Sequence, residues 1–228
     1  MGVILPPISV TYVKLRSLFT PKRHYIQTED SGFWGRPIVN NCTTCALRNL
    51  LALNKSDKKI EVVTGLHDML VALEAQKPSL YEYIAEKSRP NPDGSYLQLK
   101  TKAVAQFLEL LGTEPEMIYG GEPQNHLRLK RLIKEGNPLL MLDSGTQTLS
   151  GDRLPPDSGH CYLIYPNKQG ECMISDSNYK SPWPISTELL LSKLLDDAQS
   201  AALIINAPPD PKGFYKRLNA VSYLPRYA

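Results

Sequence analysis

The sequence predicts an α+β protein in which a helical first half packs against a sheet formed by the second half. Apolar residues in the first half recur at the spacings of three and four that place them on one face of a helix. In the second half they form short continuous runs and a hairpin pattern, which are typical of buried strands. With 228 residues, of which 42% are hydrophobic, the chain can bury one sizeable core, so a single domain is expected.

The first expected helix follows the polar pair Asn40-Asn41, which supplies side chains suited to capping a helix N-terminus. Its apolar stripe includes Leu47, Leu50 and Leu51, and it ends before the turn-forming residues 54–57. Four further helices are expected, of which the last two stop at glycine, a residue that favours helix C-termini. They span residues 61–76, 80–87, 101–111 and 125–135.

The second half begins with a short apolar run at residues 138–142, which predicts a buried strand. A polar loop at residues 144–158 follows, and residues 160–165 and 171–177 then predict a hairpin. A helix at 186–199 and a closing strand at 201–206 complete the expected elements. Helices therefore come before most of the sheet, as in α+β domains.

The two ends of the chain lack a clear pattern. Residues 1–39 show no periodicity and are expected to be a lead-in segment, residues 40–206 to form the main domain, and residues 207–228 to be a C-terminal tail. The early prolines Pro6 and Pro7 interrupt any signal-peptide core, and Pro6 stands where an acylation motif needs Ser or Thr. Neither a cleaved leader nor a lipid anchor is expected.

The charge balance argues against two classes of partner. The formal net charge is only +3, from 26 Lys and Arg against 23 Asp and Glu. Such a balance has no broad positive footprint for nucleic acid or for an anionic membrane surface. No apolar run reaches the roughly 18 residues that a spanning helix needs. We therefore expect neither nucleic acid nor a membrane as a partner.

Four cysteines in a chain of this length are too few for a disulfide scaffold. Cys42 and Cys45 form a Cys-x-x-Cys pair, whereas Cys161 and Cys172 flank a predicted hairpin turn. A four-thiolate zinc site needs close spacing in both pairs, and the second pair lacks it. We expect no metal and no cofactor, and we expect the thiols to matter for their reactivity.

Cys42 is the candidate nucleophile. It lies at the start of a predicted helix, where unpaired backbone N–H groups and the helix dipole favour a thiolate, whereas Cys45 falls one turn further in. A nucleophilic thiol also needs a base, and His160 begins a predicted strand directly after a glycine. A buried structural thiol and a thioredoxin-type redox pair are the alternatives for Cys42. The redox interpretation needs a preceding strand, which residues 31–37 do not resemble.

The hairpin register connects Asp176 to His160. If the loop has three residues and ends at Gly170, Asp176 lies opposite Tyr162, on the face that His160 shares by the period of two. Asp176 is then a diagonal neighbour of His160, within reach of its Nδ1 proton. A four-residue loop would place Asp176 opposite Cys161, on the other face. The proposed triad of Cys42, His160 and Asp176 therefore predicts the three-residue loop.

These residues resemble a known pattern. The segment Asn41-Cys42-Thr43-Thr44-Cys45-Ala46-Leu47 is similar to the Asn-Cys-x-x-Cys-Ala-Leu signature of papain-fold toxins, notably the glutamine deamidase effectors that bacterial pathogens inject into host cells. Gly159-His160, followed sixteen residues later by Asp176, looks like the rest of that pattern. Asn178 stands where many members carry Gln. Gly136-Asn137-Pro138 also resembles a strand of double-glycine-peptidase-like proteins, and the likeness covers residues 40–176.

The resemblance implies a papain-like fold, with the nucleophile helix packed on a C-terminal antiparallel sheet. It implies a cysteine-dependent deamidase that hydrolyses a glutamine carboxamide of a host protein through a thioester on Cys42. Such a toxin would be secreted without a cleaved signal peptide and delivered into the host cytosol. A papain-like peptidase is the first alternative, and acyl transfer to an amine is the next.

The chain departs from papain-like peptidases at one position. These enzymes carry a Gln a few residues before the Cys to stabilise the oxyanion, and Arg36 occupies that place here, with Gln27 the nearest Gln upstream. The backbone N–H of Cys42 can supply one hydrogen bond, while Asn40 or Asn41 could give the second or only cap the helix. The missing Gln keeps open a non-catalytic binding module on a degenerate papain-like scaffold.

Overall fold

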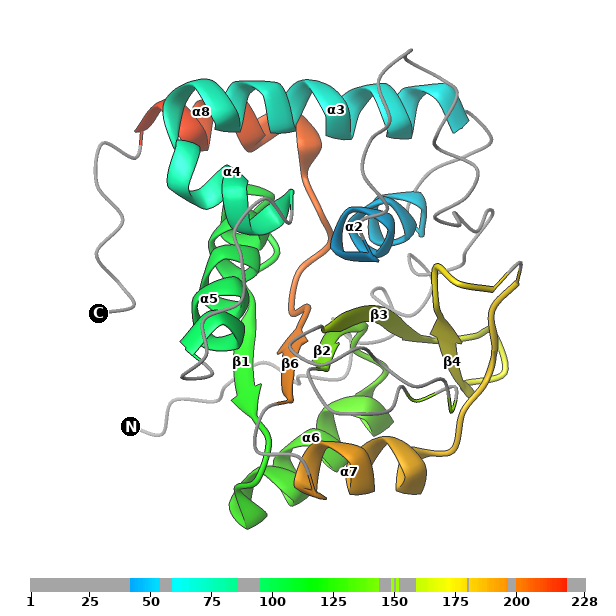
Figure 1. The fold of residues 1–228 in the computed structure, drawn as a ribbon. Coiled ribbons are helices and arrows are strands. Elements are labelled where there is room, and N and C mark those ends of the chain that lie inside the picture. Colours follow the sequence, from blue (N-terminus) through cyan, green and yellow to red (C-terminus); the bar gives the residue numbers. More distant parts are fainter. Residues whose placement is uncertain are drawn as a thin grey trace, which may run out of the picture.

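An antiparallel sheet of six strands, covered by helices on both faces, forms the centre of the molecule (Figure 1). A computed structural model describes residues 42–53, 59–85, 95–143, 149, 151, 159–179, 181–196 and 200–220. The strand order is β1-β6-β2-β3-β4-β5, and every neighbouring pair is antiparallel. The strands are β1 (Glu116–Tyr119), β2 (Leu139–Asp143), β3 (His160–Pro166), β4 (Cys172–Ser175), β5 (Trp183–Pro184) and β6 (Ala201–Ile204).

The helices divide into two groups around this sheet. Two of them, α6 (Pro123–Glu135) and α7 (Thr187–Asp196), lie beside each other below the sheet in Figure 1. The others lie on the opposite side and are α2 (Cys42–Ala52), α3 (Lys59–Gln76), α4 (Pro78–Ile84), α5 (Ser95–Leu110) and α8 (Pro211–Ala220). The fold is therefore α+β, as the sequence predicts.

Each face of the sheet has its own core. The large-core face packs against α2, α3, α5 and α8, and its sheet residues are Leu140, Leu142, Cys161, Leu163, Tyr165 and Leu203. The small-core face packs against α6 and α7, and its buried sheet residues are Ile118, Leu139, Met141, Tyr162, Ile164, Ile174, Ala202 and Ile204. Successive residues of β3 alternate between the two cores because side chains of a strand point to opposite faces in turn.

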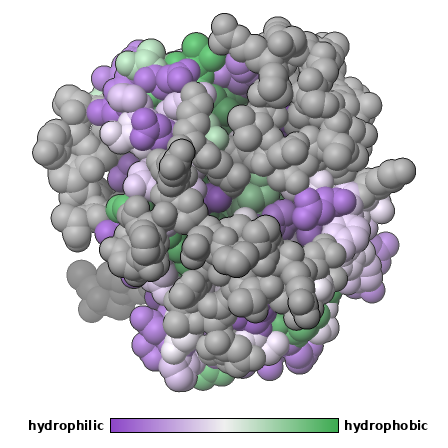
Figure 2. Space-filling model, in the orientation of Figure 1, coloured by the Kyte–Doolittle hydropathy of each residue, from purple (hydrophilic) through white to green (hydrophobic). Residues whose placement is uncertain are grey.

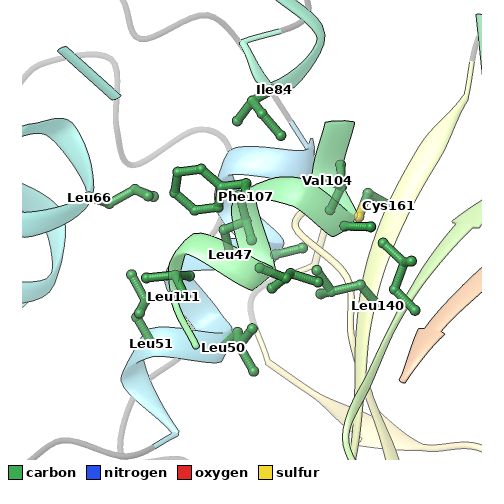
Figure 3. Close-up of a cluster of buried hydrophobic side chains, with 14 of the residues drawn as sticks. Leu47, Leu50, Leu51, Leu66, Ile84, Val104, Phe107, Leu111, Leu140 and Cys161 are labelled. Carbon is green, nitrogen blue, oxygen red and sulfur yellow. The ribbon is translucent and has the colours of Figure 1, made fainter. Parts of the chain in front are cut away.

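Helix α2 lies at the centre of the large core. Every one of its residues is buried, and Figure 3 shows Leu47, Leu50 and Leu51 directed toward side chains of the neighbouring helices. Phe107 of α5 packs close by, and its ring lies 5.5 Å from that of Phe214 on α8. Burial on all sides fixes the position of α2, which matters because α2 carries Cys42 at its first residue.

The hairpin between β3 and β4 has the register that the triad hypothesis requires. Leu163 pairs with Ser175 and Pro166 with Cys172, so paired numbers sum to 338 throughout. The backbone N–H of Asn167 bonds the Glu171 carbonyl, which closes a three-residue loop. Gly170 ends that loop with φ of 83°, a left-handed conformation that glycine adopts without strain. The predicted three-residue loop is confirmed.

Three described elements were not expected from the sequence, and the shortest of them is the two-residue strand β5 at the other edge of the sheet. Strand β1 pairs with β6 at the edge of the sheet, and residues 211–220 form α8 within the segment expected to be a tail. Asp210 accepts a hydrogen bond from the Gly213 N–H at the start of α8, and Pro211 is its first residue. Phe214 and Leu218, four residues apart, are buried in the large core. This part of the tail therefore belongs to the domain.

The described surface carries both hydrophobic and hydrophilic side chains. Figure 2 shows hydrophobic and hydrophilic residues interspersed over the described part of this side of the molecule. Within the described ranges, no helix combines the length and apolar character that crossing a bilayer requires. The largest single exposures of apolar side chains are at Leu127 and Val71, which lie on different helices.

Candidate active site

Cys42 is the first residue of α2, and its side chain is buried. Helix α2 packs against strand β3, which begins at His160 (Figure 1). This packing brings the helix N-terminus to the end of the sheet where the imidazole lies. The N-terminal backbone N–H groups of a helix favour a negative charge on a nearby sulfur.

His160 and Asp176 form a buried hydrogen-bonded pair. The distance from His160 Nε2 to Asp176 Oδ1 is 2.7 Å, and their side chains are 6% and 0% exposed. Asp176 comes directly after β4, and the same oxygen accepts a hydrogen bond from the Asn178 N–H at 2.9 Å. The backbone of Asn178 therefore orients the carboxylate, while its side chain is exposed.

The Cys42 side chain hydrogen-bonds to His160. All three residues that the sequence singled out therefore lie in one connected series, from sulfur to imidazole to carboxylate. The helix comes from the first half of the chain, and the imidazole and the carboxylate come from the hairpin. The tertiary packing of α2 on β3 is what joins them.

One detail of the sequence-based prediction is wrong. Asp176 was expected at Nδ1 of His160, and it bonds Nε2 instead. The reason is reach, since diagonal neighbours in an antiparallel pair are separated by about 7–8 Å and only the outer ring nitrogen spans that distance to a short Asp side chain. Nδ1, which is closer to the backbone of β3, is then the ring nitrogen left for Cys42.

The surroundings of His160 favour its charged form. Burial alone would lower its pKa, but the hydrogen bonds to Asp176 and Cys42 and the electrostatic interactions with both residues raise the pKa of His160 from 6.5 to about 10. The imidazole is therefore protonated at neutral pH. A protonated imidazole beside a thiol at a helix N-terminus is the arrangement that stabilises a thiolate.

Two further residues lie next to His160 and were not proposed as site residues from the sequence, although the period of two had placed Tyr162 on the same face of the strand. The ring of Tyr162 meets that of His160 at a centroid distance of 4.7 Å and an angle of 77°. Asp143 lies directly opposite His160 in the β2–β3 pair, and its carboxylate is 3.7 Å from Lys193 Nζ. The period of two within β3 could have identified Tyr162, whereas Asp143 required the β2–β3 register.

The other thiols have different surroundings. Cys45 is buried one turn along α2, and Cys161 is buried in the large core. Cys172 packs at the small-core face, where burial raises its thiol pKa to about 11. All four thiols lie in the described part of the chain and none forms a disulfide. Cys161 and Cys172 thus lie on opposite faces of the sheet.

Some proposed site residues cannot be placed. Asn40 and Asn41, the two candidates for an oxyanion donor, lie outside the described residues, as do Arg36 and Gln27. Among the residues that are described, no group of three or more His, Cys, Asp or Glu is arranged to hold a metal ion. The described site brings together a thiol, an imidazole and a carboxylate.

Comparison with protein families, curated proteins and solved structures finds no match for this chain.

Proposed function

We propose that this chain is a papain-like thiol hydrolase that attacks a carboxamide or amide carbon with Cys42. The observation that carries this proposal is the hydrogen-bonded series from Cys42 through His160 to Asp176. A nucleophile, a base within hydrogen-bond reach and a group that orients the base are the three parts of a nucleophilic triad. A nucleophile helix packed on an antiparallel sheet that carries the other two residues agrees with a papain-like arrangement.

The proposed reaction has two halves. The Cys42 thiolate attacks the carbonyl carbon and forms a tetrahedral adduct, and the His160 imidazolium then gives its proton to the leaving nitrogen. Ammonia or an amine departs, leaving a thioester on Cys42. A water molecule attacks the thioester while neutral His160 takes its proton, and the carboxylic acid product leaves as the sulfur regains its negative charge. Asp176 holds the imidazole in place throughout.

We propose a glutamine side chain of a protein as the substrate, which makes the chain a protein glutamine deamidase. The likeness of residues 41–47, 159–160 and 176 to papain-fold toxins supports this choice. By the same likeness, the chain is an effector toxin that is delivered into the host cytosol and acts on a host protein. Peptide-bond cleavage uses the same triad, so a papain-like peptidase is the alternative.

A mass-spectrometric experiment separates the two reactions. The full chain is incubated with a host-cell lysate, and peptides are searched for Gln-to-Glu conversion and for new termini. Conversion without new termini supports a deamidase, and new termini support a peptidase. Cys42→Ala should abolish the product, while Cys45→Ala, a matched loss of a buried thiol on the same helix, should retain it. The reverse result would contradict Cys42 as the nucleophile.

Thiol reactivity tests the proposal against a non-catalytic binding module, the alternative motivated by Arg36. An enzyme should show rapid alkylation of Cys42 by iodoacetamide near neutral pH, because its thiolate is stabilised, and slow alkylation of Cys45, Cys161 and Cys172. Peptide mapping after short exposure assigns the label to each cysteine. Equal and slow labelling of all four thiols would exclude the hydrolase and leave the binding module.

A further inference from the structure

We infer that Tyr162 is a positioning residue for His160, and that its hydroxyl group joins the imidazole to the connection between β2 and β3. This inference rests on the proposed function, because it assigns a role to Tyr162 in orienting the proposed base. Tyr162 is not part of the triad and has no role in the proton transfers described above. The ring contact, the burial and the hydroxyl hydrogen bond of Tyr162 support the inference.

The first observation is the ring contact. Tyr162 lies two residues after His160 on β3, so both side chains leave the strand on the same side. The rings meet nearly at right angles, at 77°, with their centroids 4.7 Å apart. Edge-to-face geometry of this kind is directional, so it restricts rotation of the imidazole as well as covering it.

The second observation is the burial of Tyr162. Its side chain is 0% exposed, and its ring packs in the small core with Met141 and Ile164 as neighbours on the same face. A side chain held in a close-packed core has little freedom to change rotamer. Tyr162 is therefore a rigid surface against which the imidazole is set, with Nε2 directed to Asp176.

The third observation concerns the hydroxyl group. The Tyr162 oxygen accepts a hydrogen bond from the backbone N–H of Leu149 at 3.0 Å. Leu149 lies in the connection between β2 and β3, and its side chain packs against the small core. The ring of Tyr162 thus contacts the proposed base, His160, and its hydroxyl group bonds Leu149 in the connection between β2 and β3.

Other titratable groups near His160 must stay constant in any test. Cys42 from α2 and Asp176 after β4 hydrogen-bond to it, and Asp143 lies opposite on β2, with Lys193 of α7 beside that carboxylate. None of them is altered by a substitution at Tyr162. Two variants can therefore separate the ring from the hydroxyl: Tyr162→Phe removes only the oxygen, and Tyr162→Met removes the ring while keeping an apolar side chain.

Three measurements on the full chain test the inference: the titration of the His160 imidazole by NMR, the iodoacetamide alkylation rate of Cys42, and hydrogen exchange of the Leu149 amide. Tyr162→Phe should accelerate exchange at Leu149 and leave the other two unchanged. Tyr162→Met should lower the pKa of His160, because a less restricted ring makes weaker hydrogen bonds to Asp176 and Cys42. It should also slow alkylation at neutral pH by roughly two- to tenfold.

Tyr165→Met is the matched control, because Tyr165 is a buried tyrosine of the same strand on the large-core face. It should leave the His160 titration and Cys42 alkylation unchanged. Equal effects of Tyr162→Met and Tyr165→Met, or no effect of Tyr162→Met, would overturn the positioning role. Unchanged Leu149 exchange in Tyr162→Phe would overturn the link through the hydroxyl.

A variant that fails to fold does not prevent the test. If Tyr162→Met is unfolded, NMR of the unaltered chain should show ring-current shifts and close proton contacts between the His160 and Tyr162 rings, and their absence would overturn the inference. Failure of the proposed function gives a different result. An unaltered chain with no selective Cys42 alkylation and no deamidation contradicts the hydrolase, whereas the His160 titration still reports on Tyr162.

Discussion

The two faces of strand β3 differ in composition and in what they contribute. On the large-core face, Cys161, Leu163 and Tyr165 pack into a helical core. On the other face, Tyr162 and Ile164 continue into the small core, but the strand begins with His160, which bonds Asp176. Within this seven-residue strand, the side chains on the large-core face contribute to stability, whereas His160, on the other face, contributes to the proposed chemistry.

This separation has a physical basis. A buried ionisable pair is tolerated only when its groups are hydrogen-bonded to partners, and such partners gather at the end of the sheet, where Asp176 leaves β4 and Cys42 begins α2. The middle of the strand has no such requirement and is filled by close-packed apolar side chains. We therefore expect substitutions on the two faces to affect different measurements.

The largest effect is expected for His160→Gln. The amide nitrogen of Gln reaches about as far from the backbone as Nε2 and can still donate a hydrogen bond to Asp176, so the fold should be retained. The amide cannot carry a proton between the thiol and the leaving group. Activity should fall by about 10²- to 10⁴-fold. Steady-state deamidation rates, with far-UV circular dichroism as the check on folding, measure this change. Turnover close to that of the unaltered chain would remove His160 from the proposed mechanism.

The converse substitution is Leu163→Ala on the large-core face. Leu163 is 0% exposed, so its truncation leaves a cavity and should lower the free energy of unfolding by about 2–5 kcal/mol. Urea denaturation gives this value. Activity per folded molecule should be unchanged under conditions where the variant is folded. A large loss of activity without a loss of stability would contradict the separation between the faces.

A smaller effect on rate is expected for Asp176→Asn, because the neutral amide oxygen holds the imidazole less firmly than the carboxylate does, and a misplaced group costs on the order of 10²-fold. The substitution should also lower the pKa of His160, since the hydrogen bond and the charge of Asp176 both raise it. NMR titration of the imidazole measures that change. An unaltered titration would mean that Asp176 does not control the charge of His160.

The hydrogen-bonded pair of His160 and Asp176 predicts how the stability of the chain depends on pH. The pKa of His160 is raised from 6.5 to about 10 in the folded chain, so its stabilising interaction is complete below pH 6.5 and is lost as the pH rises to about 10. The difference in unfolding free energy between the unaltered chain and Asp176→Asn should therefore shrink over that range. Denaturant titrations at several pH values provide the comparison, and a constant difference would contradict this assignment.

The smallest effects concern the two hairpin thiols. Cys161→Ser places a hydroxyl among the apolar side chains of the large core and should cost about 1–3 kcal/mol of unfolding free energy. Cys172→Ser, at a partly exposed position, should cost less because water can reach the hydroxyl. Urea denaturation of the two variants in parallel shows which of them loses more unfolding free energy. Neither should change activity, and a reversed order would show that the faces are misassigned.

Much of this molecule could be predicted from local pattern. The expected helix at 125–135 corresponds to α6 (Pro123–Glu135), and the expected strand at 138–142 to β2 (Leu139–Asp143). Gly170 determined the loop length, and the loop length determined the register of β3 and β4 and so the face on which Asp176 follows β4. The choice of Cys42, His160 and Asp176 depended on a helix start, a strand start and this register, which are all short-range features.

Other features depended on contacts that a local pattern does not contain. Strand β1 (Glu116–Tyr119) is short, and its edge position follows from pairing with β6, which lies far along the chain. Helix α8 is stabilised by Phe214 and Leu218 in the large core, although the pair Asp210-Pro211 was a start signal that could have been recognised. The misassigned ring nitrogen of His160 likewise required the actual geometry of the hairpin.

By itself, the order of residues determined most of the secondary elements, the hairpin register and the three side chains on which the proposed chemistry depends, because helix caps, glycine turns and alternating strands act over a few neighbours. The contact between the Cys42 side chain and the His160 imidazole depends on the tertiary packing of α2 on β3. Burial between helices and sheet disfavours a charged imidazole, but the same packing brings Asp176 and Cys42 within hydrogen-bonding reach of His160, and these interactions outweigh burial and raise its pKa.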